Sequence, residues 1–322
     1  MQDVRVARNL VGAVLVTTSA VAFGSMAILG VWAQEDGAGT WPLLMLRFGI
    51  AALLLLIIVR VRRIELPSPR RIAALAAMGG IGYVGQSYCY FSALQHADAS
   101  TVALLLYLYP ALVAALAAVF LHERLAPSTV AALVLSLAGT SLVVGAGTGE
   151  PKGIALAVGA AFIYSVYITV GSRVIQGAHP LVVALTVCTA AATVCATAVL
   201  AGAARGREIQ LPESAPGWVA TAMIAVVCTV IAIVTFFSGM QLLGPTRTAV
   251  LSTLEPVVTA VLAVTLLSQV LSPTQIAGGV LVIAAVIWQA THRHPGVTSP
   301  RGGERSLAMS LPDHGSCQQQ RK

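Results

Sequence analysis

The chain has 322 residues, of which 57% are hydrophobic and only 10% are charged, and its mean hydropathy is +0.86. A water-soluble domain carries about 25% charged residues, so this composition excludes a soluble globule and predicts an integral membrane protein. The net charge of +7 does not indicate nucleic-acid binding, because the basic residues are not gathered with aromatic residues in a polar domain. The five cysteines show no repeated spacing, so neither a disulfide framework nor a metal site is predicted.

Ten apolar runs follow one another along the chain. A helix needs about 20 apolar residues to cross a bilayer core of roughly 30 Å, and lipid does not tolerate the open edge of a sheet, so each run predicts a transmembrane helix. The first run is longer than the apolar part of a signal peptide, and we expect it to remain in the protein. The runs cover residues 10–31, 42–59, 72–92, 99–120, 128–147, 153–171, 180–201, 217–239, 247–267 and 274–290.

The basic residues are distributed unevenly between the two sides of the membrane. If the N-terminus lies inside, 15 of the 19 Lys and Arg residues fall on the inner side, while Arg47 falls within a helix. Because cytoplasmic loops carry an excess of Lys and Arg, this distribution predicts cytoplasmic N- and C-termini in the inner (plasma) membrane. The polar segment 291–322 has too little apolar content to pack, so we predict a disordered cytoplasmic tail.

The two halves of the chain repeat each other. Residues 90–140 align without a gap with residues 236–286, and about a third of the positions are identical, including paired glutamines and prolines. The sequence therefore predicts an all-α membrane protein with ten transmembrane helices in two five-helix repeats, 10–147 and 153–290. Because five is odd, the second repeat enters the membrane from the opposite side, an inverted arrangement typical of transporters that alternate access around a central site.

Three stretches of the sequence resemble one known family. They are Phe91-Ser92-Ala93-Leu94 through Ala99-Ser100, Tyr109-Pro110 to Leu121-His122-Glu123-Arg124-Leu125, and Leu254-Glu255-Pro256. With these motifs the chain is similar to the EamA family of the drug/metabolite transporter superfamily. The resemblance implies ten helices, a central cavity between the halves and the movement of small metabolites, often outward. His122 stands where the family usually has Gly, and Ser268-Gln269 where Gly-Glu is frequent, so no essential chemistry is assigned to that acidic position.

Two ionisable residues fall within the predicted spans, where each costs about 2.5 to 3.5 kcal/mol on insertion scales. Glu255 lies about eight residues into the ninth run, near the membrane midplane. It is either a cavity carboxylate that binds a cationic group or a proton, or a protonated group that is hydrogen-bonded between helices for structural reasons. Arg47 lies nearer the outer surface, where it either contacts the solute or extends to the membrane surface.

Prolines interrupt the fourth and ninth runs at matching places. Pro110 and Pro256 each lack a backbone donor, which frees the carbonyl four residues earlier, that of Leu106 or Ser252. Matching interruptions in two halves point to a transport site, and the alternative is that they only kink the helices for packing.

Polar-tipped aromatic residues recur at helical spacing and are typical of a cavity wall. Tyr90 shares their face of the third run, but it could equally be an anchor at the membrane interface. The residues that we expect to line a translocation cavity, together with Arg47 and Glu255, are Tyr83, Gln86, Tyr107, Tyr109, Tyr164 and Tyr167.

Motifs of common enzyme classes are absent or incomplete. The GxGxxG of Gly80 to Gly85 follows an apolar helical run instead of a strand, so it indicates close helix packing. His122-Glu123 lacks the second histidine of a zinc-protease motif, and no phosphate-binding loop of the Walker type is present. We therefore expect no catalytic residue, metal or cofactor.

The sequence as a whole predicts a secondary transporter that exports small polar or amphipathic metabolites, such as amino acids, by alternating access, with proton coupling as an option. The alternative is a polytopic membrane enzyme that acts on a lipid-linked substrate. The expected partners are a small-molecule solute and membrane lipid, and not nucleic acid. A homodimer stays open, because the glycine-rich spans near residues 79–85 and 278–279 could pack within one chain or between two.

Overall fold

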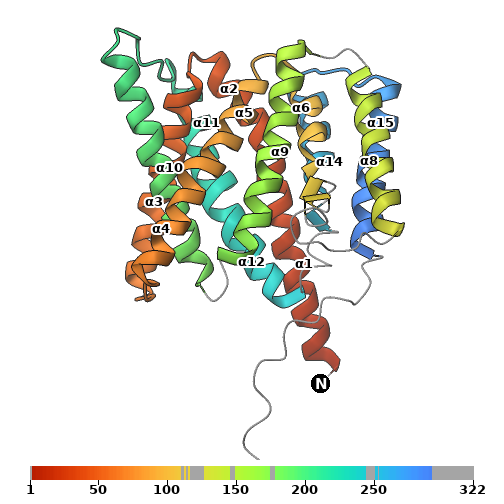
Figure 1. Cartoon of the computed structure of the whole chain (residues 1–322), viewed down its shortest axis with the longest axis horizontal. Coiled ribbons are helices and arrows are strands. Elements are labelled where there is room, and N and C mark those ends of the chain that lie inside the picture. Colours follow the sequence, from red (N-terminus) through yellow and green to blue (C-terminus); the bar gives the residue numbers. More distant parts are fainter. Residues whose placement is uncertain are drawn as a thin grey trace, which may run out of the picture.

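The computed structural model describes residues 2–109, 112–113, 115–116, 127–145, 149–174, 178–243, 251–252 and 254–291. Within these ranges every regular element is helical, in agreement with the predicted all-α class. The helices stand side by side in one bundle, and the N-terminal end of the first helix projects beyond it (Figure 1).

Five helical segments are long and apolar enough to cross a membrane. They are Asn9–Glu35, Thr40–Val61, Pro151–Gly171, Pro180–Ala203 and Ala215–Phe236, and the shorter apolar helices are Leu254–Leu266 and Pro273–Ala285. Large apolar side chains such as Leu53, Ile57 and Val261 remain more than half exposed on the outside of the bundle. Such side chains are suited to contact with lipid.

The first half of the chain contains several breaks that the apolar runs do not reveal. The predicted run 10–31 is divided at Ser25, and the run 72–92 contains a π-helical turn. The elements are α1 (Gln2–Gly24), α2 (Met26–Glu35), α3 (Thr40–Val61), α4 (Pro69–Ala77), η1 (Met78–Tyr83), α5 (Val84–Ala93), α6 (Ala99–Leu106) and α8 (Pro127–Gly145).

The second half is interrupted in a related way. A second six-residue π-helical segment divides the run 217–239, which is the repeat counterpart of the run 72–92. The elements are α9 (Pro151–Val174), α10 (Pro180–Ala203), α11 (Ala215–Ala225), η2 (Val226–Ile231), α12 (Ala232–Leu243), α14 (Leu254–Leu266) and α15 (Pro273–Thr291).

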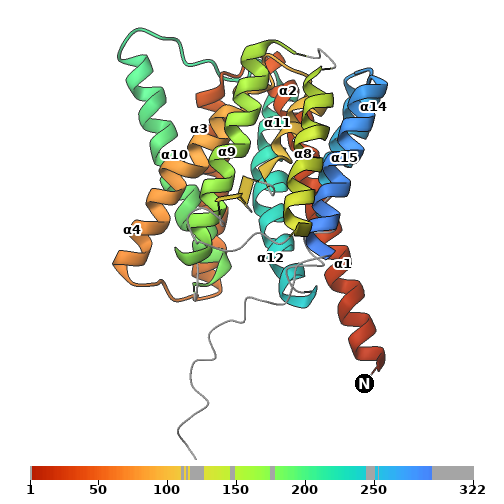
Figure 2. The ribbon, with the colours of Figure 1, turned by 45° about the vertical axis from the view of Figure 1, so that its right-hand side comes forward.

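Helices from the two halves pack against each other throughout the bundle. The helix α8 packs on α15 and α3 packs on α10, and both pairs lie side by side in the two views (Figures 1 and 2). Two further contacting pairs, α1 with α12 and α5 with α9, correspond to each other, because α9 is the repeat counterpart of α1 and α12 that of α5. The halves are thus intertwined, and the middle of the bundle is built from both of them.

Glycines allow the helices next to this middle region to approach closely. A Cβ atom added at Gly82 would lie 3.1 Å from the Tyr167 ring, and one added at Gly79 would lie 2.5 Å from the Val187 carbonyl oxygen. The glycine-rich segment around residues 79–85 therefore packs within the chain. The same holds for Gly278, whose carbonyl would lie 2.6 Å from a Cβ atom at Gly139, so these glycines give no support to a homodimer.

Candidate functional site

A cavity of about 300 Å³ lies inside the bundle, with walls contributed by both halves. Its floor and sides include apolar groups from α1 and α12, such as Phe23 and Ile233. All eight residues that the sequence predicts for a translocation cavity line this one space: Arg47, Tyr83, Gln86, Tyr107, Tyr109, Tyr164, Tyr167 and Glu255. Their role in binding remains a prediction.

Arg47, on α3, points into the protein and is only 2% exposed. Its Nε donates to Thr229 Oγ1 at 3.0 Å, and its Nη2 donates to Tyr83 Oη at 3.2 Å. Its guanidinium carbon also lies 4.9 Å from the centre of the Phe48 ring and 5.5 Å from that of Phe91. The idea that Arg47 extends to the membrane surface is therefore wrong, because its polar and aromatic partners all lie inward.

The buried guanidinium group has no acidic partner in the part of the chain that the structure describes. Two neutral hydroxyl groups hold it, and rings stack around it. A buried cation is costly unless an anion or a set of dipoles compensates it, and a guanidinium group carries five N–H donors. In the described residues only these neutral groups compensate the charge of Arg47, which lines the cavity.

Thr229 was not predicted from the sequence. It lies in η2, where its hydroxyl donates to the Ile224 carbonyl at 2.9 Å, so the oxygen of that hydroxyl is left to accept from Arg47. Tyr83, the other partner of Arg47, is the last residue of η1. The two π-helical segments therefore position both hydroxyl groups, which agrees with the frequent occurrence of such turns at functional sites.

Glu255 and Pro256 lie in the first turn of α14 as the structure describes it, and the predicted helical residues 247–250 and 253 lie outside the described residues. Glu255 is partly buried, and its Oε2 lies 3.0 Å from Tyr107 Oη. The same hydroxyl lies 2.7 Å from the carbonyl oxygen of Ser252, the group that Pro256 leaves without its usual helical donor. Tyr107 thus joins α6 to this interruption.

A row of tyrosines connects the two ionisable residues. The ring centres of Tyr107 and Tyr109 are 5.8 Å apart, those of Tyr109 and Tyr164 4.8 Å, those of Tyr164 and Tyr167 6.1 Å, and those of Tyr167 and Tyr83 5.6 Å. These spacings are typical of aromatic side chains in contact. The row begins at the partner of Glu255 and ends at the partner of Arg47, so it forms an aromatic wall between these two residues.

The remaining predicted residues have less defined roles. Gln86 is buried, and its Oε1 accepts from Ser87 Oγ at 3.2 Å. Tyr90 is 3% exposed and packs edge-on against Phe91, so it is not an interface anchor. Pro110 and the tail from residue 292 onward lie outside the described residues.

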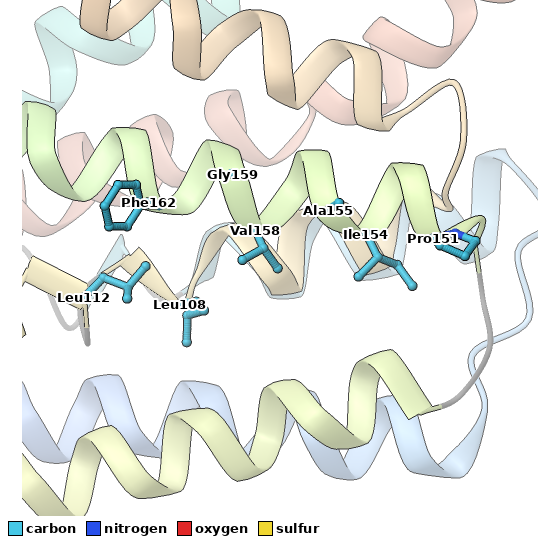
Figure 3. Close-up of a pocket in the computed structure, with 8 residues that line it drawn as sticks. All are labelled: Leu108, Leu112, Pro151, Ile154, Ala155, Val158, Gly159 and Phe162. Atoms are coloured by element: carbon cyan, nitrogen blue, oxygen red, sulfur yellow. The ribbon is translucent and has the colours of Figure 1, made fainter.

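A second hollow, of about 790 Å³, opens beside α9. Figure 3 shows Leu108 and Ile154 directed toward the space between α9 and the yellow-green helix α8. Its eight lining residues are all apolar or glycine. The described part of this groove therefore offers surface to an apolar chain but no group that could act as an acid, base or nucleophile.

Known families and structures resemble this chain along most of its length. The sequence profile of the EamA-like transporter family matches residues 10–145 and, a second time, residues 151–290. The chain belongs to this family. The resemblance noted from the sequence motifs is thereby confirmed, and with its long apolar helices this EamA-like protein is a multi-pass membrane transporter.

One relative of this EamA-like transporter has a named substrate. The aromatic amino acid exporter YddG of Ancylobacter novellus is 38% identical to it over 99 residues, which is 29% of this chain and 34% of the exporter. The alignment thus spans about a third of that relative's length. A solved crystal structure is 22% identical, with a TM-score of 0.63 over 87% of this chain and 96% of the other chain, which shows a shared fold.

Proposed function

We propose that this protein is a secondary transporter with ten transmembrane helices in two inverted five-helix repeats, and that it exports amphipathic solutes such as amino acids by alternating access. The observation that carries the proposal is the cavity itself. It contains a buried cation, Arg47, and a carboxyl group, Glu255, on either side of a row of tyrosines.

The chemistry of the cavity is complementary to a zwitterion with an apolar side chain. A guanidinium group forms strong, paired hydrogen bonds with a carboxylate, and Glu255 can pair with an ammonium group. The tyrosine rings between them supply contact area to an apolar or aromatic side chain. A volume of about 300 Å³ is at the lower end for ligand sites, which favours a small solute.

Alternating access is supported by the relation between the halves. The π-helical segments η1 and η2 occupy corresponding runs of the two repeats. The contact between α1 and α12 likewise corresponds to the contact between α9 and α5. Interrupted helices that meet at a central site are typical of inverted-repeat transporters. In the proposed orientation both termini lie in the cytoplasm, as the distribution of Lys and Arg predicts.

Proton exchange is proposed as the driving force. Glu255 is the one carboxyl group that lines the cavity among the described residues, and burial in an apolar environment favours its neutral form. The ammonium group of a solute favours the ionised form instead, so solute and proton would compete for the same site.

The rival function, a membrane enzyme acting on a lipid-linked substrate, would need reactive groups next to lipid. The described residues that line the groove beside α9 are all apolar or glycine. The family and the name of the relative also point to a transporter.

Counterflow in proteoliposomes tests the proposal. Vesicles loaded with unlabelled phenylalanine should accumulate external radiolabelled phenylalanine only when they contain the protein. Phenylalaninamide lacks the carboxylate and N-acetylphenylalanine lacks the ammonium group, so each should compete about 10- to 100-fold less well, since a hydrogen bond to a charged group contributes about 1.5 to 3 kcal/mol. Equal competition by all three compounds would contradict the assignment of Arg47 and Glu255 to the two charged groups of the solute.

A further inference from the structure

One hydroxyl group lies between two acceptors in the cavity wall. Tyr107 Oη is 2.7 Å from the carbonyl oxygen of Ser252 and 3.0 Å from Glu255 Oε2. A tyrosine hydroxyl carries one hydrogen and can donate to only one of them at a time. Ser252 O can only accept, and Pro256, four residues later, has no N–H to offer it.

We infer that Tyr107 is a switch that couples the protonation of Glu255 to the hydrogen bonding of the Ser252 carbonyl, which Pro256 leaves without its usual helical donor. When the carboxyl group is protonated, Glu255 donates to Tyr107 Oη, and Tyr107 donates to Ser252 O. All three groups are then hydrogen-bonded, and the carbonyl that proline leaves free is held by α6. This inference rests on the proposed proton-coupled transport through the cavity.

Loss of the proton reverses the direction of the bond at Glu255. A carboxylate can only accept, and hydrogen bonds to charged acceptors are roughly twice as strong as neutral ones. Tyr107 therefore turns its hydrogen to Glu255, and Ser252 O loses the hydrogen bond from Tyr107. The proton itself leaves to water on the side to which the cavity is open at that moment. The carboxylate and the free carbonyl together can then accept hydrogen bonds from the ammonium group of a solute.

The beginning of α14 is well placed to transmit this change. Thr259 Oγ1 donates to the carbonyl of Gly24 at 2.8 Å, where α1 ends. A Cβ atom at Gly24 would lie 2.8 Å from the Glu255 carbonyl oxygen, so the two backbones are in close contact. A shift in the first turn of α14 must therefore move the junction of α1 and α2 at Ser25.

Other titratable groups near Glu255 do not account for such a switch. Among the described residues they are Arg47 of α3, Tyr83 of η1, Tyr90 of α5, Tyr109 next to α6, Tyr164 and Tyr167 of α9, Cys188 of α10 and Cys228 of η2. Arginine stays charged, and tyrosine and cysteine are uncharged at the pH at which carboxylic acids titrate. Glu255 is the group among them whose charge changes in that range.

Hydrogen–deuterium exchange of the solute-free protein in detergent tests the switch. We would compare peptides covering residues 254–262 at pH values on both sides of the transition, after correction for the chemical exchange rate. In the wild type, ionisation should speed their exchange about 2- to 10-fold, as expected for the loss of one hydrogen bond of about 0.5 to 1.5 kcal/mol. Glu255→Gln should exchange slowly at every pH, because its amide can still donate to Tyr107. Tyr107→Phe should exchange fast at every pH.

Tyr90→Phe is the matched control, since it removes a buried tyrosine hydroxyl from another helix and should behave as the wild type. A wild type whose corrected exchange does not change with pH would overturn the switch, as would a Tyr107→Phe protein that keeps the pH dependence. If Tyr107→Phe does not fold, a pH-dependent Glu255→Gln protein overturns it instead. Because no solute is present, the exchange experiment does not depend on the outcome of the counterflow experiment. If counterflow fails but the exchange results confirm the switch, the amino-acid substrate is rejected and the role of Tyr107 is kept.

Discussion

Arg47 and Glu255 line the same cavity, but the protein holds them in different ways. Arg47 is fixed by hydrogen bonds to Thr229 and Tyr83 and by the ring of Phe48. The side chain of Glu255 has a single described hydrogen-bond partner, the hydroxyl of Tyr107. In the proposed mechanism Arg47 is therefore the fixed partner of an anionic group, and Glu255 is the group whose bonding changes during transport.

Arg47→Lys keeps the positive charge but loses the planar, forked donor and the bond from Nε to Thr229. We expect the affinity for phenylalanine to fall about 10- to 100-fold in a scintillation proximity binding assay, because a bidentate contact with the carboxylate contributes about 1.5 to 3 kcal/mol. Binding of phenylalaninamide, which has no carboxylate, should change little.

The matched control for this substitution is Arg60→Lys, an exposed arginine at the other end of the same helix α3. It should bind both compounds as the wild type does. If Arg47→Lys weakens phenylalanine and phenylalaninamide equally, the guanidinium group shapes the cavity and does not bind the carboxylate.

At the level of single residues, the sequence was informative where burial is costly. Polar side chains within apolar runs must face other protein groups or a cavity, and for this reason the eight predicted residues line one space. Thr229 gave no such signal, because a threonine can satisfy its hydroxyl with its own helix backbone. For Arg47 the sequence left two alternatives open, because depth in the membrane does not show which face of the helix a residue occupies.

Residues at or beside several helix interruptions line the cavity, and only some of these interruptions can be predicted. Hydropathy identifies apolar runs, but an extra residue in a turn leaves hydropathy unchanged, so the segments η1 and η2 were not foreseen. The break between α1 and α2 at Ser25 also leaves the hydropathy of the run unchanged, so the apolar run did not reveal it. Prolines are visible in the sequence, and the predicted release of the Ser252 carbonyl by Pro256 agrees with the bond that Tyr107 donates to it.

Pro256→Ala would supply the missing N–H to Ser252 O and compete with Tyr107. We expect a more regular first turn of α14, a higher melting temperature and slower counterflow. A stabilisation of one state by about 1 kcal/mol lowers the population of the other about fivefold, and the transport rate should fall by a similar factor.

Pro180→Ala is the control for this change, because Pro180 is the first residue of α10, where a backbone N–H has no helical acceptor. Its counterflow should match that of the wild type. Wild-type transport by Pro256→Ala would show that the interruption is a packing kink, the alternative that the sequence left open.

On the scale of the whole molecule, the two halves also meet at one end of the bundle, the outer end in the proposed orientation. Asp36, after α2, accepts hydrogen bonds from the amide and the hydroxyl of Ser214, before α11. These bonds hold the pKa of Asp36 below its usual value, so the carboxylate stays ionised. Gly39 N also donates to Gln210 O at 2.9 Å. Polar loops far apart in the sequence make this junction, and no local pattern could predict it.

If transport requires this junction to open, a covalent link across it should stop transport. A Cβ atom built at Gly217 lies 2.8 Å from the Asp36 Cβ, and a disulfide needs about 3.8 Å, so Asp36→Cys with Gly217→Cys requires a shift of only about 1 Å. Oxidation of the double variant should abolish counterflow, and a reductant should restore it. The wild type, with its five native cysteines, and each single variant should transport equally well before and after the same treatment. A double variant whose disulfide is verified by peptide mapping, but which transports at the unlinked rate, would show that this end of the bundle stays closed throughout the cycle, in conflict with alternating access across it.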